Sequence, residues 1–149
     1  MKLPEDDPDA FDLFVLWLYV GTLEVDNGNR NKASAYIQVW KLGDKLEIHA
    51  LQDNPMLQLI QIFDEQCLWA EMFGLMYDGS APGCKLRHYA IDQILWDRHL
   101  GVPYDDTEKY LKLAKVTEDI GLDFMRAGLR GCRLENPADQ KTRYLIIPN

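Results

Sequence analysis

The chain has 149 residues, 47% of them hydrophobic and 27% charged, which is enough apolar material for the core of one ordinary globular domain. Its formal net charge of -8 makes nucleic acid and anionic membrane surfaces poor partners, because both are negatively charged. There is no apolar run of about 20 residues to span a bilayer, and the start MKLPEDDPDAF is acidic where a secretory signal is basic and then apolar. With three cysteines and no C-x-x-C pair, the sequence predicts an intracellular protein of the cytoplasm or nucleus with free thiols.

The first predicted element is a helix that begins at Pro8 and ends before Gly21. Asp7 suits the N-cap, proline suits the first helical position, and glycine suits the stop. Apolar side chains fill nearly the whole circumference: Phe11, Leu13, Phe14, Val15, Leu16, Trp17, Leu18 and Val20. Because a helix that is apolar nearly all round has to be enclosed by other elements, we expect it to be central in the fold.

The next two predicted elements follow a polar loop over residues 24–32. The second helix ends at Ile48, and its apolar positions are Ala35, Tyr36, Val39, Trp40, Leu42 and Leu46. The following segment, residues 50–63, is interrupted by Pro55, and a proline inside a helix costs about 3 kcal/mol. We therefore expect the helix to restart there, with Asn54 as its cap and Pro55 at its first position.

The rest of the chain also has the pattern of helices separated by turns. We expect a fourth helix over residues 65–77, a turn over residues 78–83, and a fifth helix over residues 85–99. A capping box at Asp105 and Glu108 would open a sixth helix with inward Leu111, Ala114 and Ile120, and a seventh over residues 122–130 would carry Phe124, Met125 and Leu129. Asn136 and Pro137 would open a polar tail, and the only β-like run is residues 144–147. The predicted fold class is mainly α, a bundle of six or seven helices.

Three stretches of the chain match the pattern of one known family. LPEDDPDAFDLFVLWLYVGTL has an acidic turn, a Phe-containing apolar helix and then Leu-Tyr-x-Gly. LGDKLEIHALQD follows as a helix pair, and MYDGSAPGCKLRHYAID has a tyrosine before a Ser/Pro/Gly turn, then Leu-Arg and Ile-Asp. In this order they resemble the fungal type of the BTB/POZ domain family, and the later GLDFMRAGLR is compatible with the final helix of those proteins.

The resemblance implies a domain organisation and a function. Residues 1–64 would be a partial BTB/POZ domain consisting of its C-terminal helices, and residues 65–149 a helical C-terminal extension packed on it. The implied function is non-catalytic protein–protein interaction, with a partner or with itself, through apolar helix faces. The strand-rich first half of the family's domain has no counterpart here, so cullin ligase recruitment is not expected. The first helix would lose its usual neighbours, and the predicted partner-binding residues are Phe11, Phe14, Trp17, Leu18 and Tyr19.

Metal and catalytic sites have little support in the sequence. Cys84 and His88 are four residues apart, but a zinc site needs about four ligands, and His49, His99 and Cys67 have no matching spacing. Cys84 is better explained as a poor helix cap. No phosphate-binding loop or nucleophile elbow occurs, and paired carboxylates such as Glu118-Asp119 suit helix starts. We expect no cofactor, no metal and no catalytic residue.

Three other possibilities remain open from the sequence. They are a small helical enzyme, a metal-binding protein, and a truncated, non-functional BTB product.

Basic residues also gather late in the chain, at Arg126, Arg130, Arg133, Lys141 and Arg143. Because aromatic residues are not interleaved with them and the total charge is acidic, a solvated helix face explains them better than a nucleic-acid interface.

Overall fold

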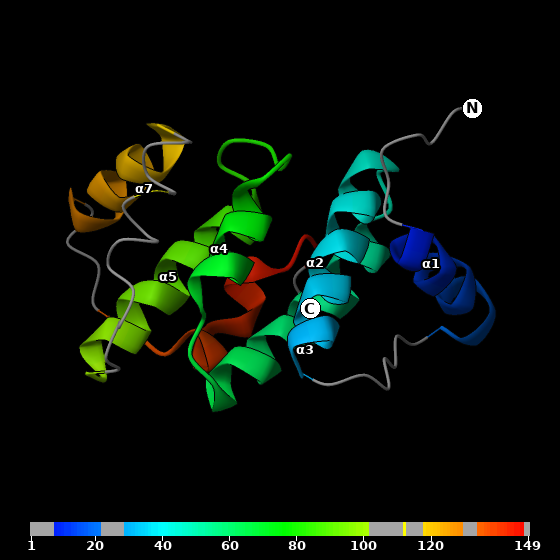
Figure 1. The fold of residues 1–149 in the computed structure, drawn as a ribbon, viewed down its shortest axis with the longest axis horizontal. Helices are drawn as coiled ribbons and strands as arrows, with labels where there is room; N and C mark the ends of the chain where they lie inside the picture. The colour runs from blue at the N-terminus through cyan, green and yellow to red at the C-terminus, as the bar shows by residue number, and fades with distance from the viewer. Residues whose placement is uncertain (1–7, 22–28, 102–111, 113–117, 130–133, 148–149) are drawn as a thin grey trace.

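The computed structural model describes residues 8–21, 29–101, 112, 118–129 and 134–147. Within these ranges the chain forms six α-helices and one 3₁₀-helix and contains no strand (Figure 1). They are α1 (Pro8–Val20), α2 (Asn29–Lys45), α3 (His49–Glu65), α4 (Ala70–Tyr77), α5 (Lys85–His99), α7 (Glu118–Leu129) and the 3₁₀-helix η1 (Pro137–Tyr144). The predicted mainly α bundle of six or seven helices is confirmed. The expected caps at Asp7 and Asp105, and the sixth helix at Leu111 and Ala114, lie outside the described residues.

The centre of the fold is the pair α2 and α3, which the short link at residues 46–48 places side by side. Both helices bury large apolar side chains in one cluster: Ile37, Trp40, Leu51, Leu59, Ile60 and Phe63. The two helices lie close together at Gly43, where a Cβ atom would lie 3.0 Å from Cγ of Gln52 and 3.2 Å from its backbone nitrogen. α4, α5 and η1 extend the same core, which therefore includes side chains from both predicted units of the chain.

The expected restart at Pro55 is wrong, because α3 continues without a break from His49 to Glu65. Pro55 itself is buried, and so are apolar side chains on both sides of it, among them Leu51 and Leu59. Full burial of a leucine side chain contributes about 1.5–3 kcal/mol, so the turns on either side together outweigh a proline cost of about 3 kcal/mol. Tertiary packing therefore keeps the helix continuous through a residue that would end it in isolation.

The predicted start of α4 is also wrong, since the helix begins at Ala70 and not at residue 65. The backbone N–H of Leu68 donates to Oδ2 of Asp97 on α5, at 2.8 Å. Leu68 is fully buried, and Trp69 has an extended backbone at the N-cap position. This bond between distant residues holds the connection in a non-helical form. α2, in contrast, begins earlier than expected, at Asn29, within the predicted polar loop.

The C-terminal segment is neither a polar tail nor a strand, which corrects both expectations. Asn136 accepts a hydrogen bond from Ala138 N at 3.0 Å and caps η1, which packs on α3 and α5. Tyr144 is buried, with its ring edge-on to another aromatic ring of the core. The carboxylate of Asp53 accepts from the backbone N–H groups of Ile146 at 2.6 Å and Ile147 at 2.9 Å. Because a side chain binds these donors, the β-like sequence needs no partner strand.

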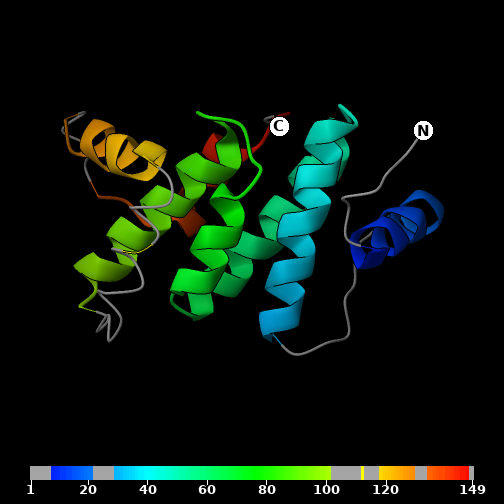
Figure 2. The ribbon, with the colours of Figure 1, turned by 45° about the horizontal axis from the view of Figure 1, so that its top comes forward.

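The expectation that α1 is central is wrong. α1 packs against α2 at one end of the molecule, and α7 lies at the other end (Figures 1 and 2). Ala10 is its only buried side chain, while Leu18 and Tyr19 are 58% and 86% exposed. The helix ends as predicted at Gly21, whose φ of +76° suits glycine and whose N–H donates to Trp17 O at 2.8 Å. None of the described helices is both long and apolar enough to cross a membrane.

The close contact at Gly43 predicts opposite effects for two glycine-to-alanine substitutions. Gly43→Ala forces a methyl group against Gln52 and should lower the free energy of unfolding by about 1–3 kcal/mol. Gly121→Ala on α7 meets no atom within 4 Å and should raise it by about 0.5–1 kcal/mol through helix propensity. Urea unfolding followed by circular dichroism measures both. A neutral or stabilising Gly43→Ala would contradict the described helix spacing.

Candidate functional site

The turn between α4 and α5 is built from residues that the third family-like stretch contains. Gly79 and Gly83 have φ values of +68° and +73°, which turn the chain where other residues would be strained. Ser80 is buried, and its Oγ donates to Met76 O at 2.6 Å. Cys84 is the N-cap of α5 and makes no side-chain capping hydrogen bond, as expected for a poor cap. The backbone carbonyl groups of Tyr77 and Ser80 in this turn need a hydrogen-bond donor from elsewhere.

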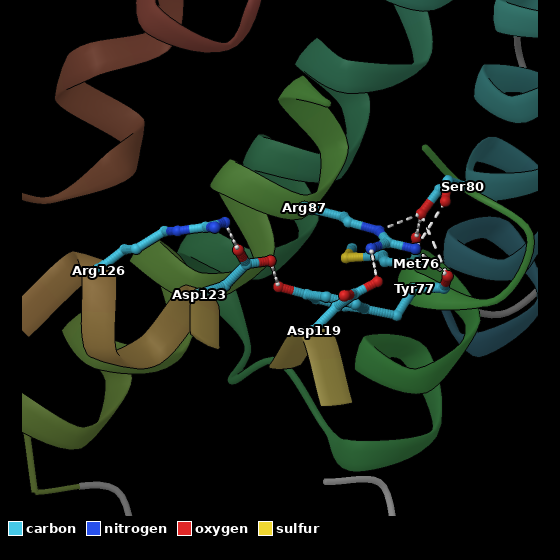
Figure 3. Close-up of polar contacts among 7 residues, drawn as sticks. All are labelled: Met76, Tyr77, Ser80, Arg87, Asp119, Asp123 and Arg126. Atoms are coloured by element: carbon cyan, nitrogen blue, oxygen red, sulfur yellow. Dashed lines mark hydrogen bonds and ion pairs between the residues drawn. The ribbon is translucent and has the colours of Figure 1, made fainter. Parts of the chain in front are cut away.

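Arg87, one turn into α5, supplies these donors (Figure 3). Its Nε donates to Ser80 Oγ at 2.9 Å, and its Nη2 donates to the carbonyls of Tyr77 at 3.0 Å and Ser80 at 2.6 Å. Its Nη1 donates to Asp119 Oδ2 at 3.1 Å, and its guanidinium carbon lies 4.7 Å from the centre of the Tyr77 ring. Every nitrogen of a guanidinium whose side chain is only 6% exposed thereby has a hydrogen-bond partner, which a buried charge requires.

The same cluster attaches α7 to the rest of the fold. Besides Asp119 on Arg87, Asp123 accepts a hydrogen bond from the Tyr77 hydroxyl at 2.8 Å (Figure 3). Burial, and then this hydrogen bond to Asp123, raise the pKa of Tyr77, so the hydroxyl stays a donor. Ile120 is buried between these two acids in sequence, and the Phe124 ring lies 6.2 Å from that of Phe73. The arrangement is that of a structural latch between α7 and the α4–α5 turn.

A second buried polar chain runs along α5. The Tyr89 hydroxyl donates to Gln93 Oε1 at 3.2 Å, and Gln93 Nε2 donates to Asp97 Oδ1 at 2.8 Å and to Phe63 O at 3.1 Å. Asp97 ends the chain by accepting from Leu68 N. Burial raises the pKa of Asp97, and its hydrogen bonds from Leu68 and Gln93 only partly oppose that shift. The side chains of Tyr89, Gln93 and Asp97 therefore hold one another and the backbone of neighbouring segments in place.

A cavity of about 360 Å³ opens between α5, α7 and the segment before η1. Its apolar wall includes Ile91 and Leu95, and its polar residues are Lys85, His88, Asp92, Asp123, Glu135 and Arg143. Lys85 Nζ donates to Arg143 O at 2.9 Å, and the Arg143 guanidinium pairs with Glu135 at 2.9 Å. Asp92 accepts from the Tyr144 hydroxyl at 2.8 Å, and Asp123 from Tyr77. The three carboxylates of the wall therefore each make a structural hydrogen bond or ion pair.

The described residues give little support for a reactive nucleophile or a metal site. Burial raises the pKa of the Cys84 thiol, which works against a reactive thiolate. Burial lowers the pKa of Lys41, but this side chain lies on α2 among other charged groups and outside the cavity. In the described ranges no group of three or more His, Cys, Asp or Glu side chains is close enough to hold a metal ion.

The five predicted partner-binding residues fall into two groups on α1. Phe14 and Trp17 are half-buried and pack against the core, on the same side of the helix as Ala10. Phe11 is 40% exposed, with its ring centroid 6.0 Å from that of Phe14. Leu18 and Tyr19 point away from the core and are exposed. The structure therefore brings three of the five to one uncovered surface.

Sequence reasoning missed the other members of that surface and the whole Arg87 cluster. Leu16 and Val20 are exposed on α1 together with Phe11, Leu18 and Tyr19, and these five residues are called the α1 outer face below. An enclosed helix was expected, so no side of it was singled out. For Arg87 a signal existed, since an arginine sits among the inward positions of α5. Its partner Asp119 is 32 residues away, and Asp123 is 46 residues from its partner Tyr77, so no local pattern links these residues.

Replacing Arg87 tests the latch. Arg87→Met leaves the Tyr77 and Ser80 carbonyls and Asp119 without their donor, and should lower the free energy of unfolding by roughly 3 kcal/mol. Arg87→Lys should recover only part of it, because an ammonium cannot form the same fork. The matched control is Arg126→Ala, an exposed pair at 3.4 Å, with an expected change under about 1 kcal/mol. Equal losses for Arg87→Met and Arg126→Ala would refute a structural role for the cluster.

The raised pKa of Asp97 predicts a pH dependence. The folded protein holds the Asp97 proton more tightly than the unfolded chain, so the contribution of this group is present below pH 3.8 and is lost as the pH rises through the folded pKa. Asp97→Asn removes this titration. The free energy of unfolding of the variant minus that of the wild type should therefore increase as the pH rises above 3.8. Urea unfolding of both proteins over a pH series measures the difference, and a decrease with pH would contradict the burial effect.

Comparisons of the chain with models of protein families, with curated proteins and with solved structures each find no match. The resemblance to BTB/POZ domains therefore stays a prediction based on three sequence stretches. The candidate sites are defined by their own residues: the Arg87 latch, the polar cavity and the α1 outer face.

Proposed function

We propose that the protein is a non-catalytic protein-interaction domain that binds its partner through the α1 outer face. The observation that carries this proposal is the exposure of large apolar residues around the outer side of α1, with Leu18 at 58%, Tyr19 at 86% and Val20 at 61%. A single exposed leucine is ordinary, but a cluster of large apolar side chains on one element marks an interaction surface.

The shape of α1 supports the same proposal. Its inward residues Ala10, Leu13, Phe14 and Trp17 recur at helical spacing and hold the helix against the core. The remaining circumference is nearly as apolar as the inner stripe, although packing within the described chain does not require it. Burying such side chains gives about 25 cal/mol for each Å² removed from water, so a partner that covers them gains directly. Aromatic anchors such as Phe11 and Tyr19 are typical of binding surfaces.

Kinship with BTB/POZ domains belongs to the proposal. The resemblance implies that the family's corresponding helix is covered by other elements, which agrees with an apolar surface on α1 that a binding partner would cover. Enzymatic and metal-binding functions are less well supported, because Lys85, Asp92, Asp123, Glu135 and Arg143 of the cavity make hydrogen bonds or ion pairs within the fold and the Cys84 pKa is raised.

The proposal is tested by the double substitution Leu18→Ser/Tyr19→Ser. Both side chains are exposed, so the fold should survive with a change of less than about 1 kcal/mol, measured by thermal circular dichroism. Capture of partners by the immobilised protein, and self-association measured by sedimentation velocity, should fall to background. Phe14 and Trp17 are unsuitable positions, since they pack against the core and their loss would weaken folding itself.

The matched control is Leu100→Ser/Met125→Ser, which changes two apolar residues that are 61% and 64% exposed on other parts of the fold. This variant should keep the wild-type partners. If the α1 variant retained the same partners at the same affinity, the α1 outer face would not be the binding surface.

A further inference from the structure

We infer that the partner of the α1 outer face is a basic amphipathic segment, with Lys or Arg beside an apolar stripe. This inference rests on the proposed function and names the chemistry of the partner. Its starting point is an uneven charge distribution. Residues 3–29 contain seven acidic and no basic residues, so they carry all but one of the net negative charges of the chain.

Two of these seven acidic residues, Asp9 and Asp12, lie on α1 with the apolar residues. Asp9 and Asp12 are exposed in the first turns, and Leu16 and Tyr19 follow Asp12 at i+4 and i+7, on the same side of the helix. The outer side is therefore acidic in its first half and apolar in its second half. Asp9 also suits the positive end of the helix, but Asp12 lies beyond the first turn, where that effect has faded.

This pattern discriminates between occupants. A lipid surface is disfavoured, because helices that lie on membranes are rich in Lys and Arg, and α1 has neither. A second copy meeting α1 against α1 offers no Lys or Arg to Asp9 and Asp12, because α1 contains neither, and both helices carry net negative charge. A partner with basic residues gains attraction at Asp12 and burial at Leu16 and Tyr19 at the same time.

Two synthetic helical peptides test the inference with the full chain. Both carry the same Leu/Phe stripe, and the polar positions beside it are Lys in one peptide and Glu in the other. We expect the Lys peptide to bind at least about tenfold more tightly, measured by fluorescence anisotropy. Raising NaCl from about 0.1 M to about 1 M shortens the screening length from ~10 Å to ~3 Å and should weaken the Lys peptide selectively.

Variants assign the effect to α1. Asp9→Asn/Asp12→Asn should weaken the Lys peptide by about fivefold or more and leave the Glu peptide unchanged or slightly tighter. Glu65→Gln/Glu71→Gln removes two exposed charges from α3 and α4, and should leave both affinities unchanged. Leu18→Ser/Tyr19→Ser should abolish binding of the Lys peptide.

The contrary outcomes separate the inference from the proposed function. Equal binding of both peptides, lost on Leu18→Ser/Tyr19→Ser, would overturn the basic partner and keep the α1 surface. If neither peptide bound and the protein self-associated in a way that Leu18→Ser/Tyr19→Ser removes, the occupant would be a second copy. That result would also overturn the basic partner and keep the α1 surface. Binding of the Lys peptide that survives Leu18→Ser/Tyr19→Ser would overturn both proposals, as would failure of both peptides without self-association.

Discussion

The arrangement of α4, α5 and α7 depends on the hydrogen bonds made by the buried guanidinium of Arg87. One side chain on α5 satisfies two carbonyls of the α4–α5 turn and a hydroxyl within it, and also reaches Asp119 on α7. A charge held at this depth is stable only while its nitrogens keep their hydrogen-bond acceptors. The conformation of the turn, the direction of α5 and the position of α7 are therefore set together. The buried chain from Tyr89 to Asp97 extends the same principle along α5.

The parts of the fold that follow from local chemistry were predictable. The limits of α5 were predicted residue for residue, since helix periodicity and the flanking turn and Gly101 agree. The limits of α1 followed equally from proline at its start and glycine at its end. Pro55 and Leu68 mislead because distant partners decide their conformation: the burial of α3 on both sides of the proline, and the carboxylate of Asp97. Both influences come from packing and from distant residues, so no local sequence pattern reveals them.

The candidate surface was predictable in its residue types but not in its orientation. An apolar circumference indicates that α1 has to be covered, and sequence alone does not say which side the chain itself covers. The packing of Phe14 and Trp17 inward and of Tyr19 outward depends on how α1 meets α2. The partner-binding set therefore mixed core residues with surface residues. The same ambiguity explains why Leu16 and Val20 were passed over.

The clamp of Asp53 on Ile146 and Ile147 has a consequence for biosynthesis. These bonds join residues 93 and 94 positions apart, and Tyr144 joins Asp92 over 52 positions. The core beneath η1 stays open on the ribosome until residues 144–147 have been translated and have left the exit tunnel. Helices α3 and α5 are then complete but lack the packing that η1 gives them, so during this interval their apolar side chains are exposed to aggregation.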